Sequence, residues 1–511
     1  MQESRVRNTT NAFIWNLYNV VITSLFPFLI RTLLIRYIGL EYTGISSLFT
    51  SIMQIVNLAD LGFESAICFF LYRSMAGRDD RYTGSLLHYL KSIYHKIGVV
   101  IFVISILLLP VLHLFIYGQD YPKDINLYII FIIYIFNAVM PYFAGYYSAT
   151  VFKSDQRADV LAKIGGTTAF IMYAAQIVAI VRFQNFYVYT LLLLVNSCLL
   201  PIMVNRAQKK KYPEIKCEGW PEEGTIREIK KKVYAIAISK IRNVSRNSFD
   251  SVVISSFVGL SILTLYQNYY QVMLLPNVLL AVIHGSVAPS LGNGFALESK
   301  DSNYGVVKLY AFLVFSFSTV AVSCLVCLFQ PFITLWLGKD YLLDGSVVWI
   351  FAVYYQLLVI ADIAVLLREV TGIWWQGRYV AVAETAANLI LSVILVQFVG
   401  YIGVIIATII SILCINIPFE FYYVFKKFYK EKLGEFLFQQ CYYVILAFAI
   451  GIISYVICGF IQMEGIIGFG CKLCSAVAIP CFLLLVTQYK NEYVRKAFRY
   501  IKIKVSDKVQ K

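Results

Sequence analysis

The chain is a succession of long apolar segments separated by short polar ones. Fourteen segments are predicted to span a membrane, because most can cross roughly 30 Å of hydrocarbon as a helix. They cover residues 12–35, 43–72, 87–116, 125–150, 159–181, 186–204, 233–258, 262–290, 306–329, 346–367, 378–398, 400–424, 437–460 and 464–488. Inside hydrocarbon only helices or closed barrels satisfy the backbone, and these segments are too long for strands. The pattern predicts an all-α polytopic membrane protein with about 14 transmembrane helices.

Composition and charge support this class and suggest an orientation. Of the 511 residues, 59% are hydrophobic and 14% are charged, whereas soluble domains have about 25% charged residues. The net charge of +15 could indicate a nucleic-acid partner, but its placement does not. If the N-terminus is inside, cytoplasmic segments and helix ends hold 35 of the 44 Lys and Arg, and outer segments hold six. The positive-inside rule then predicts cytoplasmic termini, and no nucleic-acid partner is expected.

The two halves of the chain resemble each other at a constant offset of 220 residues. The matching pairs include Gly39 and Gly259, Met53 and Met273, Asn57 and Asn277, Asp120 and Asp340, and Tyr134 and Tyr354. Chance identity among apolar helices is the alternative explanation. An unchanged offset over more than 100 residues favours two six-helix lobes, related by a pseudo-two-fold axis along the membrane normal, with two further helices outside them.

The repeat divides the chain into five parts. They are an N-terminal lobe (1–204), a basic cytoplasmic linker (205–232), a C-terminal lobe (233–424), two C-terminal helices (425–488) and a basic cytoplasmic tail (489–511). The linker either lies on anionic lipid headgroups or is simply solvated. The tail is expected to form a short basic amphipathic helix on the membrane surface.

The segment 233–258 has the most polar sequence of the predicted spans. Arg242, Arg246 and Asp250 are spaced i, i+4, i+8 and share one helical face, with Lys240 and Asn243 nearby. A charged side chain at bilayer depth costs ~2.5–3.5 kcal/mol, so the four charges facing lipid would cost on the order of 10 kcal/mol. Asp250 can neutralise only one cation. We therefore expect this face to line a water-filled cavity between the lobes.

Other polar residues lie inside predicted spans and are further site candidates. The substrate-binding candidates are Arg31, Asn57, Gln271 and Asn277, and the ion-coupling candidates are Asp60, Glu64, Asp250, Asp362, Glu384 and Asn388. A carboxylate at this depth is kept ionised by a cation or neutralised by a proton, so Na⁺ and H⁺ both remain open. The alternative for each residue is a hydrogen bond or ion pair between helices.

Motifs for enzymatic chemistry are absent from the sequence. There is no GxxxxGK[ST] loop, no HExxH and no convincing nucleophile setting. Ten of the 11 cysteines sit in apolar stretches, so the CxxC spacings are interpreted as small core residues rather than metal or redox sites. The deep tyrosines either stack on sugar rings or belong to the core; they are Tyr134, Tyr142, Tyr146, Tyr147, Tyr354 and Tyr355.

The stretch RTLLIRYIGLEYTGISSLFTSIMQIVNLADLGFESAI, residues 31–67, closely resembles the start of bacterial polysaccharide flippases. These export O-antigen, capsule and exopolysaccharide repeat units and belong to the multidrug/oligosaccharidyl-lipid/polysaccharide (MOP) superfamily. The resemblance implies that an undecaprenyl-pyrophosphate-linked oligosaccharide is moved to the outer leaflet by alternating access. It also implies a bacterial plasma-membrane location, no cofactor, and membrane lipids and other polysaccharide-assembly proteins as partners.

The resemblance gives the polar residues roles. Arg242 and Arg246 would hold the pyrophosphate by charge-assisted hydrogen bonds, with Arg31 and Lys240 as secondary candidates. Some relatives hold sodium between helices 7, 11 and 12, where this chain has Asp250, Glu384, Asn388 and Thr408.

Two other classes of function stay open. A small-cation drug exporter of the same superfamily should have an acidic and aromatic pocket, and the three cations of 233–258 argue against it. A membrane glycan polymerase or lipid-linked glycosyltransferase commonly has a large outer loop, and the longest predicted outer loop covers only about residues 330–345.

Overall fold

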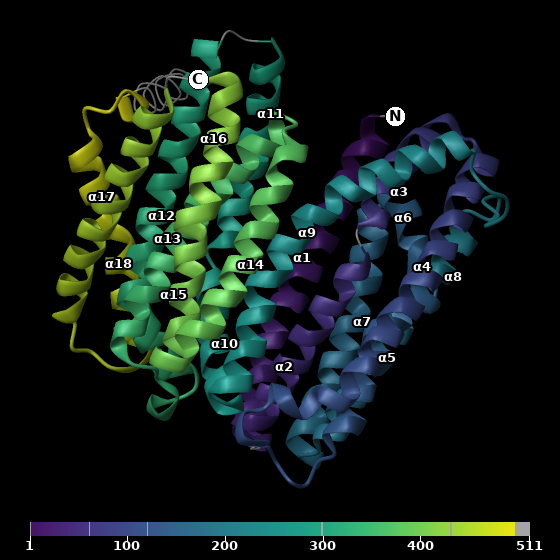
Figure 1. The fold of residues 1–511 in the computed structure, drawn as a ribbon, viewed down its shortest axis with the longest axis horizontal. Helices are drawn as coiled ribbons and strands as arrows, with labels where there is room; N and C mark the ends of the chain where they lie inside the picture. The colour runs from purple at the N-terminus through teal and green to yellow at the C-terminus, as the bar shows by residue number, and fades with distance from the viewer. Residues whose placement is uncertain (1, 61, 120, 298–299, 430–431, 496–511) are drawn as a thin grey trace. The chain divides into compact units, whose positions relative to one another are not determined.

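Long helices make up almost the whole chain (Figure 1). A computed structural model describes residues 2–60, 62–119, 121–297, 300–429 and 432–495. It is 89% helical, with no strand in these ranges. Two compact units are distinguished, Met1–Thr264 (unit 1) and Leu265–Lys511 (unit 2), and their boundary falls inside α10 (Leu260–Leu274). The predicted division into two lobes at a repeat of 220 residues stays a prediction.

Unit 1 contains nine helices before α10. They are α1 (Gln2–Leu33), α2 (Leu40–Val56), α3 (Phe63–Gly77), α4 (Asp80–Leu108), α5 (Leu127–Phe143), α6 (Ala149–Ser154), α7 (Ala158–Val178), α8 (Phe186–Lys211) and α9 (Glu223–Phe257). Helix α1 packs on α7, α5 on α8, and α2 on α9. The core between α2 and α5 is aromatic: the Phe49 ring lies 5.0 Å from that of Phe131 and 5.6 Å from that of Tyr134.

Unit 2 is built around α13. Its helices are α11 (Asn277–Leu297), α12 (Lys300–Trp336), α13 (Gly345–Val370), α14 (Trp374–Val399), α15 (Tyr401–Ser411), α16 (Ile417–Phe428), α17 (Leu433–Gly459) and α18 (Gly465–Gln488). Helix α13 contacts α11, α12, α14, α15 and α16, and Phe351, Tyr354 and Tyr355 on it are fully buried. The hairpin α17–α18 packs against α12, where the Phe315 and Tyr443 rings stack 4.0 Å apart.

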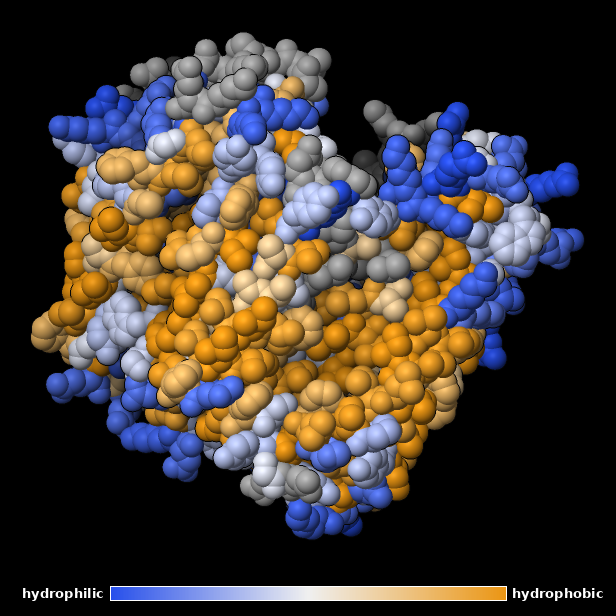
Figure 2. All heavy atoms as spheres, in the orientation of Figure 1, coloured by the Kyte–Doolittle hydropathy of each residue, from blue (hydrophilic) through white to orange (hydrophobic). Residues whose placement is uncertain are grey.

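The predicted spans match the observed helices closely. Eleven described helices are long and apolar enough to cross a membrane, or thirteen if two bent helix pairs each form one span. Each of these corresponds to one predicted span, and the remaining prediction, 233–258, falls within the 35-residue helix α9. Helix α9 carries too much charge to qualify by composition, so the count of fourteen holds only if α9 also crosses. On the visible face of each unit, hydrophobic residues cover the middle and hydrophilic ones gather toward the ends (Figure 2).

Two spans of unit 1 are broken in the middle. The first bends by 46° between Leu40–Asp60 and Phe63–Gly77, and the second bends by 48° between Leu127–Phe143 and Tyr146–Ser154. A glycine with positive φ stands at each break, Gly62 (φ 80°) and Gly145 (φ 94°). Only glycine adopts this conformation without steric cost, so these two positions end the preceding helices. Backbone groups near both breaks are left available for side chains or ligands.

The linker between α8 and α9 is docked on α4. The Gly84 backbone is so close to the Lys216 carbonyl that an added Cβ would lie 2.0 Å from that oxygen. His88 Nδ1 donates a 2.6 Å hydrogen bond to the Gly219 carbonyl, and the Trp220 ring packs edge-on against the His88 ring. The linker is therefore held on protein along part of its length, an arrangement that neither sequence interpretation of it included.

Candidate functional site

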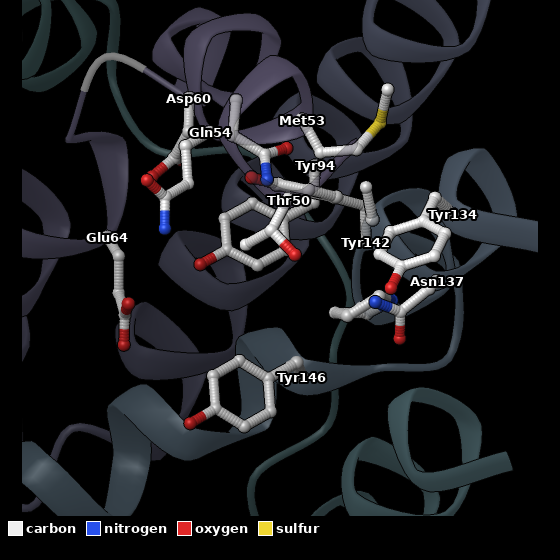
Figure 3. A pocket seen from close by; sticks show the side chains of 13 residues that line it. Thr50, Met53, Gln54, Asp60, Glu64, Tyr94, Tyr134, Asn137, Tyr142 and Tyr146 are labelled. Carbon is white, nitrogen blue, oxygen red and sulfur yellow. The ribbon is translucent and has the colours of Figure 1, made fainter. Parts of the chain in front are cut away.

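The two helix breaks of unit 1 border a cavity of about 370 Å³ (Figure 3). It is lined by Thr50, Met53, Gln54, Asn57, Asp60, Glu64, Tyr94, Tyr134, Asn137, Ala138, Pro141, Tyr142 and Tyr146. These residues come from α2, the short 3₁₀ helix Asn57–Asp60, α3, α4, α5 and the 3₁₀ turn Tyr146–Ser148. The size and the mixture of rings and polar groups are those of a small-molecule site, which occupies roughly 300–1,000 Å³.

Acidic and aromatic groups lie on different sides of this cavity. Asp60 and Glu64 lie to one side in Figure 3, Tyr134 and Asn137 lie opposite, and the Tyr94 ring lies between them. Asp60 ends the 3₁₀ helix after α2, and Glu64 lies in the first turn of α3. The partial positive charge of a helix N-terminus favours a carboxylate at that turn. The first break therefore places both acids at one wall.

Neighbouring side chains hold several of the lining groups. Lys153 of α6 forms an ion pair with Glu64. The Tyr134 hydroxyl lies 2.7 Å from that of Ser46, and Ser248 of α9 donates a 3.0 Å hydrogen bond to Gln54 Oε1. The oxygen Asn57 Oδ1 is buried, and no described residue donates a hydrogen bond to it. A buried acceptor without a donor is costly, which makes this atom a contact point for a ligand or water.

The polar helix α9 is described only in part. Asp250 is fully buried, Arg246 is half-buried, and both make further interactions within the structure. The side chains of Lys240, Arg242 and Asn243 lie outside the described residues. The structure thus places one of the two predicted pyrophosphate-binding arginines on a half-buried face of a membrane-length helix.

Arg31 lies at the end of α1 and joins three helices. Its guanidinium donates hydrogen bonds to the Ser47 hydroxyl (3.3 Å) and to the Thr264 carbonyl (3.0 Å). These partners belong to α2 and to the first turns of α10. Arg31 therefore has a structural use, alongside its predicted role in substrate binding.

In unit 2 several predicted ion-coupling residues form one buried polar cluster. Glu384 is 1% exposed and accepts a 2.6 Å hydrogen bond from Asn416 Nδ2. One turn further along α14, Asn388 Nδ2 donates a 2.8 Å hydrogen bond to the Thr408 hydroxyl of α15. Asn416 belongs to a π-helical turn, Ile412–Asn416, and such turns often occur at functional sites. The predicted sodium ligands of helices 11 and 12 are thus neighbours.

The other candidates of unit 2 lie elsewhere. Asp362 is half-buried on α13, close enough to the Tyr310 and Tyr355 hydroxyls to act on them electrostatically. Gln271 is half-buried on α10, and Asn277 begins α11 with its Oδ1 buried and without a described donor. No group of three His, Cys, Asp or Glu side chains that could hold a metal ion is found among the described residues.

A buried ion pair in unit 2 was missed by the sequence interpretation. Arg368 of α13 and Glu420 of α16 have side chains that are 3% and 0% exposed, and Arg368 Nε lies 2.9 Å from Glu420 Oε2. The N–H is not aligned for a hydrogen bond along this contact, so the pair is mainly ionic. Each residue alone is a signal, because an ionisable side chain in an apolar span is rare and costly. Nothing in the sequence pairs them.

Comparison with known proteins identifies the family. The family model described as polysaccharide biosynthesis protein matches residues 10–295. No curated protein sequence matches the chain. Similar solved structures are the lipid II flippase MurJ in an inward closed conformation and an inward-facing multidrug resistance MATE family transporter of the MOP superfamily.

The likeness to these structures extends over most of each chain. For MurJ the TM-score is 0.66 at 15% identity, covering 95% of this chain and 99% of that one. For the MATE transporter it is 0.60 at 14% identity, covering 83% and 99%. A variant of the Vibrio cholerae MATE transporter VcmN gives 0.53 at 14% identity, covering 84% and 98%. At such identities the likeness shows the fold, and the family match covers more than half of the sequence. The chain belongs to the polysaccharide biosynthesis protein family and has the polytopic fold of the MOP superfamily.

Proposed function

We propose that the protein is a flippase that moves an undecaprenyl-pyrophosphate-linked oligosaccharide from the cytoplasmic to the outer leaflet for polysaccharide assembly. The observation that carries the proposal is the polarity of α9. This continuous helix is long enough to cross a membrane, and its sequence includes Lys240, Arg242, Arg246 and Asp250. Such a helix needs water, partners or an anionic ligand, because lipid alone would make the charges very costly.

The chemistry of the substrate fits this cationic helix. A pyrophosphate with its glycan cannot cross hydrocarbon unaided, since an unpaired charge in an apolar medium is strongly unfavourable. Arginine holds phosphate oxygens through two parallel hydrogen bonds, and lysine binds them as a point charge. Arg242 and Arg246 would bind the pyrophosphate while the prenyl chain stays in lipid. The buried acids Asp250 and Glu384 are the proposed groups for coupling to Na⁺ or H⁺.

A multidrug exporter is the second candidate, and one observation favours it. The cavity of unit 1 is acidic and aromatic, as a pocket for organic cations should be, because it includes Asp60, Glu64 and four tyrosines. Lys153 reduces this acidity by pairing with Glu64. The cations of α9 have no use in such an exporter. The flippase therefore accounts for more of the polar groups.

Competing substrates separate the two functions. Purified protein would be reconstituted into vesicles that contain a lipid-linked pyrophosphate trisaccharide, and ethidium would be supplied as an organic cation. We expect movement of the lipid-linked trisaccharide between leaflets and no gradient-driven accumulation of ethidium. Ethidium transport without movement of the trisaccharide would establish the exporter and reject the flippase.

A further inference from the structure

The cavity of unit 1 has a chemistry different from that of the proposed pyrophosphate site on α9. Among its described lining residues there is no Lys or Arg, and the nearest described cation that an ion pair places there is Lys153, bonded to Glu64. The carboxylate of Asp60 adds further negative charge to the same wall. Like charges in close contact cost several kcal/mol, so a pyrophosphate is excluded here.

The lining groups match the surface of a sugar ring. A pyranose has flat faces of C–H groups and a rim of hydroxyl donors. Tyr94, Tyr134, Tyr142 and Tyr146 supply aromatic faces with a negative quadrupole, which attract the slightly positive C–H groups. Carboxylates and amide oxygens accept hydrogen bonds from hydroxyls, and the acceptor Asn57 Oδ1 is buried without a described donor. Rings and acceptors thus face one space, as Figure 3 shows.

The second half of the sequence lacks this set of groups. At the offset of 220 residues Asp60 corresponds to Leu280, and Tyr94 to Val314. Gly145 corresponds to Val365, and α13 runs unbroken from Gly345 to Val370. Helix packing in this fold therefore does not require the acids or the second break. Their presence in unit 1 indicates a ligand rather than a need of the fold.

We propose that the cavity of unit 1 is a sugar-binding subsite that accepts neutral and amino sugars of the lipid-linked glycan and rejects uronic acids. This inference rests on the proposed function for its biological substrate and deepens it by naming the sugar class. Neutral hydroxyls donate to Asp60 and Asn57, and an ammonium group adds attraction to the acids and the ring faces. A uronate would bring a third carboxylate to a wall that holds two.

Binding of soluble probes tests this inference without transport. Saturation-transfer NMR on the full-length protein in nanodiscs would compare maltotriose, a neutral trisaccharide, with trigalacturonate, its acidic counterpart. We expect maltotriose to bind at least roughly tenfold more tightly, the size of effect for one hydrogen bond to a charged group. Equal affinities, or no binding of maltotriose, would overturn the proposal.

Three variants make the result specific to the cavity. Asp60→Asn should narrow the preference for maltotriose by strengthening trigalacturonate binding, a gain that misfolding cannot produce. Tyr142→Phe should keep maltotriose binding and Tyr142→Leu should lose it roughly tenfold, because only the first keeps the ring. Asp80→Asn, outside this cavity, is the matched control and should change nothing. An unchanged sugar preference in Asp60→Asn would contradict the subsite.

The transport assay of the previous section separates this inference from the proposed function. Wild-type protein that binds maltotriose as expected, but moves no lipid-linked glycan, would retain the subsite and reject the flippase. Wild-type protein that moves lipid-linked glycans ending in a uronate and a neutral sugar equally well, with Asp60→Asn indistinguishable from it, would retain the flippase and reject the subsite.

Discussion

Lys153 of α6 forms an ion pair with Glu64 in the first turn of α3. The two residues belong to the distal arms of the two broken spans, so one contact joins the segments that follow both breaks. Their side chains are 41% and 23% exposed, which places the pair in contact with solvent. Its position, more than its strength, gives it a role: it fixes the arms that border the cavity.

Removing either partner is expected to have a small effect on stability. An exposed ion pair contributes about 0.2–1 kcal/mol, so Lys153→Met and Glu64→Gln should each lower the free energy of unfolding by no more than that. The charge-swapped pair Glu64→Lys with Lys153→Glu should recover the loss. Thermal unfolding of the four proteins in one detergent gives the coupling energy. Additive effects of the single changes would show that the pair does not join the arms.

The buried pair Arg368–Glu420 should behave in the opposite way. Removing one partner leaves an uncompensated charge in the interior of unit 2, which costs roughly 3–5 kcal/mol. Arg368→Met and Glu420→Met should therefore sharply lower the amount of folded protein in the membrane. The double variant should recover most of it, because an apolar pair of similar volume avoids the desolvation of both charges. Folded yield measured by size-exclusion chromatography checks this, and a double variant as poor as the single ones would contradict it.

Cys217 in the linker reports topology, and its reactivity should depend on pH. Burial raises the pKa of the Cys217 thiol above its ordinary value of 9.0. The thiolate is the reactive form, so at neutral pH only a small fraction reacts with maleimide. The labelling rate should rise about tenfold per pH unit up to pH 9 and still increase above it. Labelling should occur only from the cytoplasmic side, with Cys217→Ser as the background control. Labelling by an impermeant reagent outside intact cells would contradict the predicted orientation.

Ion coupling is expected to depend on acids buried in the two units. We predict that Asp250→Asn or Glu384→Gln abolishes the response of transport to a Na⁺ or a pH gradient, with Asp60, Glu64 and Asp362 tested in the same way. Loss of response to only the Na⁺ gradient would assign the site to sodium. Glu435→Gln is the matched control, because the Glu435 side chain is 62% exposed. An unchanged gradient response in all five variants would remove these residues from the mechanism.

The sequence predicted the helices well because length and apolarity alone decide whether a segment can cross a membrane. The family followed from residues 31–67, and the match to residues 10–295 confirms it. The breaks at Gly62 and Gly145 were not predicted, since one glycine in an apolar run does not reveal its φ. The pairs Glu64–Lys153 and Arg368–Glu420 were missed for another reason. Each joins residues far apart in the chain, and neither falls at a helical spacing.

The aromatic prediction had a mixed outcome. Tyr134, Tyr142 and Tyr146 line the cavity of unit 1. Tyr354 and Tyr355 are fully buried core residues of α13 instead. All five looked alike in the sequence, because each is a tyrosine deep in an apolar span. What separates them is the helix break at Gly145, which opens space beside one group and has no counterpart in α13.

The most direct test of the account is the movement of a lipid-linked glycan by purified protein. Vesicles would contain a prenyl-pyrophosphate trisaccharide in both leaflets, and an impermeant glycosidase outside would digest only the glycan that reaches the outer leaflet. With wild-type protein we predict complete digestion. Arg246→Ala should slow it about 10- to 100-fold, the loss expected for one charge-assisted contact, and Arg246→Lys should also slow it. Arg206→Ala, at an exposed arginine, should match the wild type. Digestion with wild-type protein that stops at the outer-leaflet share, as in protein-free vesicles, would contradict the account.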